Sequence, residues 1–391
     1  MADMMNSENY PAQFRQNIID GLAYLLDQVS SGPPAFNPDY YQQSIHLLDY
    51  GLRIAAAWPQ CRDLLLRLSP IVEQAGYRDE WITLLERGLE HSIRENDTTA
   101  TGRIYYYAGI LYERRGRHTE AETSFVGAVQ VFAELKLFQD QACALNRLGQ
   151  LYRRQRRYDK AVAAVNQAFT LLPDDDPERG YGHLVLANTA LDGGDLSTAL
   201  THLEHAYQLW AGGQNKRMMS WSLSNMGMVY RQQKNYIRAI EVYEQAMQLL
   251  AEVVDPVNLA LTQMNLGNVY FDLDEFEKAL ALYQLAEPVF KQAGEVLRLG
   301  KLYRNMGRVY QSHQQQWDEA AAAYEQSLAY FRLLQDKVEQ FETLKQLNTV
   351  FSVQGKPEKV IEPADESSLA YPQSANYLMG LPPGGSSSFG E

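Results

Sequence analysis

The stretch Asn265-Leu266-Gly267-Asn268-Val269-Tyr270 contains a Gly-x-x-Tyr motif that recurs along the chain about every 40 residues. Copies of the motif begin at Gly109, Gly149, Gly227, Gly267 and Gly307, and Ala187 with Ala190 fills the gap in the series. Successive steps are 40, 38, 40, 40 and 40 residues. Self-similarity at such a period is typical of stacked copies of one supersecondary unit rather than of a compact enzyme domain.

One period has the pattern of two amphipathic helices. The apolar positions after the quoted glycine are Tyr270, Phe276, Ala279, Tyr283 and Ala286. Their spacing of three and four residues predicts two helices around a short polar break at Asp274-Glu275. Glycine inside a helix costs about 1 kcal/mol relative to alanine, so its recurrence indicates that the two helices approach closely there. Aromatic residues 3 and 16 positions after the glycine should fill the surrounding space.

The motif order Leu-Gly, Tyr, Ala, Phe/Tyr, Ala and Pro resembles that of the tetratricopeptide repeat across roughly residues 62–360. The copies that resemble it best are residues 142–175, 220–253 and 260–293. Their period of 40 exceeds the usual length of about 34, and resembles that of kinesin light chains and of Leu-Gly-Asn-type spindle adaptors. The resemblance implies an all-α fold, a right-handed α-solenoid of stacked helix-turn-helix units.

The sequence around the repeats suggests the domain organisation. Residues 1–61 are expected to form an N-terminal helical cap or a degenerate repeat, and residues 62–336 an array of about seven units. Residues 337–362 should form a capping helix, because the last unit of an array has no neighbour. The tail 363–391 is rich in Pro, Ser and Gly and contains no Lys or Arg, which predicts disorder.

Composition narrows the classes of partner. The formal net charge of −13 argues against general nucleic-acid binding. No run of about 18 apolar residues predicts a membrane span, and residues 1–10 lack a signal-peptide pattern. Cys61 and Cys143 are far apart, without metal or redox spacing. We therefore expect a cytoplasmic protein with no membrane partner.

No catalytic motif is apparent, so we expect no enzyme activity, no cofactor and no metal. His202 and His205 lie three residues apart on the second helix of one unit. Such a pair could hold a metal ion, but no further ligand lies nearby in the sequence. The simpler interpretation is two solvent-facing histidines.

The family resemblance implies a ligand groove lined by the first helix of each pair. Transferring the groove positions onto this chain gives a basic zone, an apolar zone and a second basic zone. This order suits an extended or helical protein segment with acidic flanks and an apolar centre. The alternative is that the arginines only offset negative helix ends and that the apolar side chains pack internally. The predicted ligand-binding residues are Arg114, Asn146, Arg153, Arg154, Asn188, Trp221, Asn225, Met228, Met264, Asn265, Asn268, Phe271, Lys301, Arg304, Asn305 and Arg308.

Asn225, Asn265 and Asn305 share one position in three consecutive repeats. Asparagine is a poor residue inside a helix, so its repetition needs a reason. In peptide-binding relatives an Asn at this position bonds the ligand backbone; the alternative is a structural bond to a neighbouring helix. The sequence thus predicts a non-catalytic interaction scaffold or adaptor. The alternatives are a peptide-sensing regulatory receptor and an RNA-binding repeat protein, and the acidic tail 363–391 could itself dock in the groove.

Overall fold

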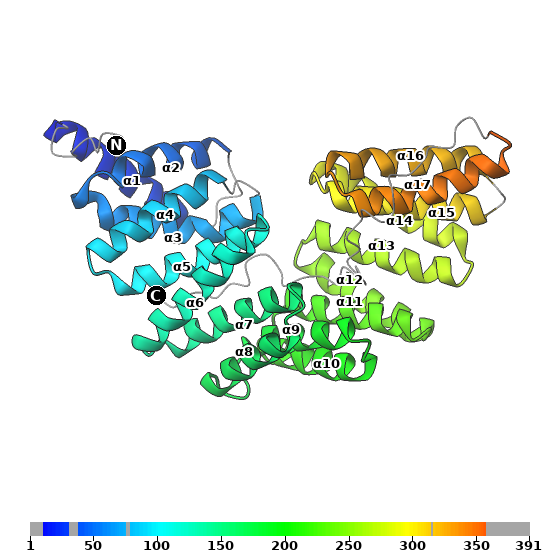
Figure 1. The fold of residues 1–391 in the computed structure, drawn as a ribbon, viewed down its shortest axis with the longest axis horizontal. Helices are drawn as coiled ribbons and strands as arrows, with labels where there is room; N and C mark the ends of the chain where they lie inside the picture. Colours follow the sequence, from blue (N-terminus) through cyan, green and yellow to red (C-terminus); the bar gives the residue numbers. More distant parts are fainter. Residues whose placement is uncertain (1–10, 31–37, 76–78, 314–315, 357–391) are drawn as a thin grey trace. The chain divides into compact units, whose positions relative to one another are not determined.

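The computed structural model describes residues 11–30, 38–75, 79–313 and 316–356, which contain seventeen α-helices and no strand (Figure 1). The all-α fold expected from the repeat is therefore confirmed. A short 3-10 helix, η2 (Ala55–Ala57), precedes α3. The helices are α1 (Ala12–Ser30), α2 (Pro38–Gly51), α3 (Trp58–Ala75), α4 (Asp79–Arg94), α5 (Thr98–Arg114), α6 (His118–Glu134), α7 (Phe138–Arg154), α8 (Tyr158–Leu171), α9 (Arg179–Asp192), α10 (Leu196–Gly212), α11 (Lys216–Gln232), α12 (Tyr236–Glu252), α13 (Pro256–Asp272), α14 (Phe276–Gln292), α15 (Val296–Ser312), α16 (Trp317–Leu333) and α17 (Lys337–Val353).

The chain divides into two compact units, and the division falls inside α9, between Thr189 and Ala190. In the first unit, helices from α3 to α8 pack in chain order, and α5 also contacts α3 and α7. In the second unit, helices from α10 to α17 pack in chain order, and α13 also contacts α11 and α15. Each unit is therefore a stack of helix pairs in which neighbouring pairs touch through their first helices, as in an α-solenoid.

The recurring glycines lie where the two helices of a pair cross. A Cβ atom added at Gly227 would lie 2.6 Å from the ring of Tyr243, and one at Gly267 would lie 2.5 Å from the ring of Tyr283. Both tyrosines are buried. The predicted close approach is confirmed, because any side chain larger than hydrogen would overlap the aromatic residue that fills the crossing.

The repeat extends to the turns between helices. Arg156, Lys234 and Asp274 all have positive φ, at 59°, 58° and 59°. After Arg156, the N–H of Arg157 donates to the carbonyl of Tyr152 at 2.8 Å. This bond satisfies one of the free carbonyls at the helix end, as in a Schellman turn. Helix ends and crossings thus follow the same period.

Some predicted features lie outside the described residues. These are the tail 363–391, the end of the predicted capping segment at 357–362, and residues 1–10 and 31–37 of the predicted N-terminal segment. Among the described helices, none is both long and apolar enough to cross a membrane.

Candidate functional site

Three predicted ligand-binding residues form what we call the asparagine row: Asn225 on α11, Asn265 on α13 and Asn305 on α15. These helices belong to the second unit, and α13 contacts both of the others. The fold therefore places the three side chains at equivalent positions on neighbouring first helices. Their surroundings, however, are not equivalent.

On α11, polar groups are buried without partners. Asn225 has 0 % of its surface exposed, and neither its amide oxygen nor its amide nitrogen has a hydrogen-bond partner among the described residues. The indole N–H of Trp221 and the hydroxyl of Ser222 are also buried and unpartnered. An unsatisfied buried polar group costs about 1–3 kcal/mol, and native structures contain few of them. Three within five residues of one helix therefore need an explanation.

On α15, the equivalent side-chain amide makes a hydrogen bond within the protein. Asn305 donates through Nδ2 to Oδ1 of Asn268 at 2.8 Å, and the hydroxyl of Tyr283 donates to the same oxygen at 2.8 Å. Asn305 therefore bonds a neighbouring helix, and Asn268 is engaged in the same network. Asn265, between the two ends of the row, is half-buried, so part of its side chain reaches the surface.

The basic residues of α15 face a buried acid on α17. Lys301 Nζ lies 3.6 Å from Glu339 Oε1, and Arg304 pairs with Oε2 of the same carboxylate. Burial lowers the pKa of Lys301 to about 8, although Glu339 opposes the shift. The guanidinium of Arg308 lies 4.2 Å from the ring centroid of Phe271. Two cations of α15 thus pair with the carboxylate of Glu339, and Asp336 also acts on Lys301.

The predicted apolar centre is largely packed into the second unit. Trp221 and Met264 are buried, whereas Met228 and Phe271 are half-buried. Met228 packs against the cluster that contains Tyr243, and Met264 belongs to the cluster around Tyr283. Of these four predicted apolar residues, Met228 and Phe271 are the two that keep part of their surface exposed.

In the first unit, Asn146 on α7 forms hydrogen bonds with Glu178. Its Nδ2 donates to the backbone carbonyl of Glu178 at 3.2 Å and to Oε1 of Glu178 at 2.9 Å. Burial raises the pKa of Glu178 to about 7, against the opposing effect of the bond from Asn146. Asp176 fixes this segment, since its Oδ1 accepts from the backbone N–H of Glu178 at 2.8 Å. Sequence reasoning missed Glu178, whose only signal is its place in the long connection before α9.

The remaining predicted residues of the first unit lie at helix ends or in the interior. Arg154 Nε lies 3.4 Å from Oε1 of the buried Glu113, and Arg153 donates to Gln150 Oε1 at 3.3 Å. Arg114 is half-buried in the last turn of α5. Asn188 on α9 is buried, and both of its amide atoms lack hydrogen-bond partners within the described part of the chain. Asn188 therefore resembles Asn225 in its surroundings rather than Asn146.

Models of the tetratricopeptide repeat match residues 100–174, 181–252 and 258–333, and a second model with this description matches residues 146–214. The chain belongs to the tetratricopeptide repeat family. No curated protein matches the sequence.

Several solved structures share the fold. The apo form of the quorum sensor NprR from B. thuringiensis has 17 % identity and a TM-score of 0.54, covering 89 % of this chain and 96 % of that one. Aspartyl phosphate phosphatase F from Bacillus subtilis has 16 % identity and a TM-score of 0.54, covering 92 % and 93 %. A Rap protein complexed with Competence and Sporulation Factor has 12 % identity and a TM-score of 0.53, covering 88 % and 100 %. At these identities the likeness shows the fold alone.

Proposed function

We propose that the first helices of the second unit, α11, α13 and α15, bind an extended peptide or protein segment without catalysing a reaction. The observation that carries the proposal is the buried amide of Asn225, which has no hydrogen-bond partner in the part of the chain that the structure describes. An Asn side chain offers both a donor and an acceptor, which matches the carbonyl and N–H of one residue in an extended backbone. A ligand would supply the bonds that the fold leaves unmade.

Asn265 and Asn305 would extend the contact with the ligand backbone. The side chains around the asparagine row would set the specificity for the ligand sequence. Backbone bonds accept any ligand sequence, so selection must come from side chains beside the row. Lys301 and Arg304 place two basic side chains on α15 beside the row, and such side chains favour an acidic group on the ligand. Met228 and Phe271 offer the apolar surface that would receive its centre. The partner we propose is therefore an acidic segment with an apolar core, bound by a cytoplasmic scaffold or adaptor.

A second function, that of a peptide-sensing regulatory receptor, is favoured by the burial of Asn225. Because this side chain has no exposed surface, a ligand reaches it only if neighbouring side chains move. Binding would then select a different conformation of the repeat array. Two proteins of similar fold are described as a quorum sensor and as a Rap protein complexed with Competence and Sporulation Factor. A third is described as a phosphatase, but function depends on the site rather than on the fold.

Selection of peptides tests the proposal. Peptides would be selected from a random display library on the full-length protein, and the affinity of the best one measured by fluorescence anisotropy. Asn265→Ala should weaken binding roughly 5- to 150-fold, equivalent to about 1–3 kcal/mol. Asn166→Ala, at an exposed position on α8, should have no effect. Equal affinities for these two variants, or no selectable peptide, would contradict the proposal.

A further inference from the structure

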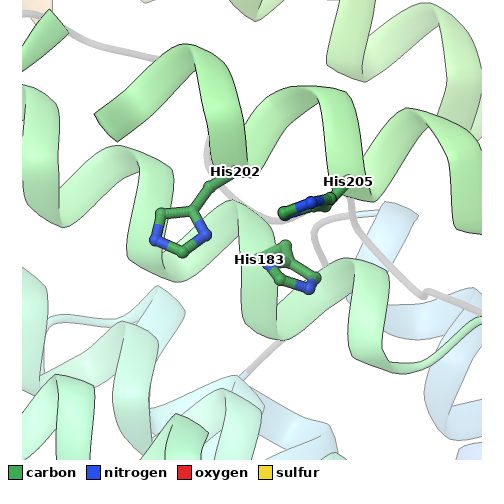
Figure 2. A group of neighbouring side chains, drawn as sticks. All are labelled: His183, His202 and His205. Carbon is green, nitrogen blue, oxygen red and sulfur yellow. The ribbon is translucent and has the colours of Figure 1, made fainter. Parts of the chain in front are cut away.

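Three histidine rings gather on the hairpin made by α9 and α10. Figure 2 shows His183 on α9 beside His202 and His205 on α10. One ring nitrogen from each lies within 4.8 Å of the others. The sequence predicted His202 and His205 to be a solvent-facing pair with no further ligand. In the structure His202 is half-buried, and a third imidazole, also half-buried, comes from the preceding helix.

The geometry of the hairpin explains why these residues meet. The turn after α9 is closed by bonds from the N–H of Gly194 to the carbonyl of Leu191 at 3.0 Å and from the N–H of Asp195 to the carbonyl of Ala190 at 2.9 Å. His183 lies eleven residues before Gly194 and His205 lies eleven residues after it. In a helical hairpin, residues equally far from the turn lie at the same height. His202 lies three residues from His205, and so shares its face of α10.

Neighbouring side chains hold the ring of His183 in place. The ring of His183 lies against Phe169 of α8, with the centroids 4.8 Å apart. Phe169 is itself covered by the guanidinium of Arg179 at 4.6 Å, so the imidazole of His183 packs against a fixed surface.

We propose that His183, His202 and His205 form a binding site for a divalent transition-metal ion, with Zn²⁺ as the best fit. Imidazole nitrogen is a preferred ligand of Zn²⁺, and three protein ligands leave a fourth position for water or for a group of a partner. Ligand nitrogens in a tetrahedral site lie about 3.3 Å apart, given Zn–N bonds of about 2.0–2.1 Å. Side-chain rotations that bring the ring nitrogens roughly 1–1.5 Å closer to one another would therefore let them surround an ion.

Calorimetric titration of the full-length, tag-free protein with ZnCl₂ tests the site. We expect one equivalent to bind, and Co²⁺ in its place to give the strong visible absorption of a four-coordinate complex. His205→Ala removes an exposed ligand with little effect on packing and should weaken binding at least tenfold, and His183→Ala should do the same. His118→Ala, at the exposed start of α6, is the matched control.

Zinc should also raise the thermal unfolding temperature of the wild-type protein and of the His118→Ala variant, but not that of His205→Ala. The proposal would be overturned by the absence of saturable zinc binding in the wild-type protein. It would also be overturned by equal zinc affinities in His205→Ala and His118→Ala, because the ion would then bind elsewhere.

Discussion

Asn225 on α11 and Asn305 on α15 occupy the same position two repeats apart, yet their amides are used differently. Asn305 donates to Asn268 at 2.8 Å, whereas neither amide atom of Asn225 has a partner among the residues that the structure describes. The polar groups nearby differ in the same way. Lys301 and Arg304 pair with Glu339, but within the described residues the buried polar side-chain atoms of Trp221 and Ser222 have no hydrogen-bond partner. The same repeat position therefore stabilises the fold at α15, while at α11 it is retained at a cost to stability.

The largest effect on stability should come from removing the ion pairs that the basic residues of α15 make with Glu339. Glu339→Ala leaves Lys301 and Arg304 without their shared carboxylate, and removing one partner of a buried ion pair costs about 3 kcal/mol. Urea unfolding should show this loss. Glu342→Ala, on the same helix, should change the free energy of unfolding by less than about 0.5 kcal/mol. Equal effects of the two substitutions would mean that the basic residues of α15 do not depend on Glu339.

A third asparagine, Asn146 in the first unit, donates a hydrogen bond to the carboxyl group of Glu178. The stability that this region contributes should therefore depend on pH. The pKa of Glu178 is raised to about 7 in the folded chain, above its ordinary value near 4.3. The folded state therefore holds a proton that the unfolded state has lost, and this stabilisation is complete below about pH 4 and disappears as pH rises through 7.

Glu178→Gln should remove this dependence. The stability of the wild-type protein relative to the variant should fall on the order of 2 kcal/mol between pH 5 and pH 8. Urea unfolding of both proteins across this range measures the difference, and other titrating groups cancel in the comparison. A constant difference would show that the Glu178 carboxyl is not shifted.

The smallest effect concerns the turns that precede the two helices α13 and α15. Val254 and Gly294 lie at equivalent positions, with φ of 52° and 66°. Left-handed backbone is costly for a β-branched residue and free for glycine, and Val254 is 82 % exposed, so its side chain contributes little packing. Val254→Gly should raise the unfolding free energy by about 0.5–1 kcal/mol. Gly294→Val should lower it, and a thermal-melt shift of the same sign for both variants would refute the explanation.

The fold could be predicted because its determinants repeat. Gly267 and Tyr283 recur at a fixed spacing, and the structure shows that the glycine is required by the ring that packs on it. Positive-φ turns such as those at Arg156 and Asp274 follow the same period. A feature that repeats in sequence and depends on local packing can be recognised without knowing the rest of the chain.

The partners of the candidate site could not be predicted in the same way. Whether Asn305 bonds Asn268 or a ligand depends on side-chain conformations on two helices, 37 residues apart in sequence. His183 joins His202 and His205 only because the turn at Gly194 sets the height of the two helices. Glu178 reaches Asn146 from the connection 172–178 between α8 and α9. Position within the repeat identified candidate residues, but their neighbours decide what each one does.

The different roles of Asn225 and Asn305 are tested by comparing Asn225→Leu with Asn305→Leu. The two variants would be measured by urea unfolding and by affinity for a peptide selected on the wild-type protein. Asn225→Leu replaces an unsatisfied buried amide with an apolar group of similar size, so it should raise stability by about 1–2 kcal/mol and weaken peptide binding. Asn305→Leu removes the bond to Asn268 and should lower stability by about 1 kcal/mol. If Asn225→Leu instead destabilises the protein as much as Asn305→Leu and leaves the peptide affinity unchanged, Asn225 has the same structural role as Asn305 and does not bind the ligand.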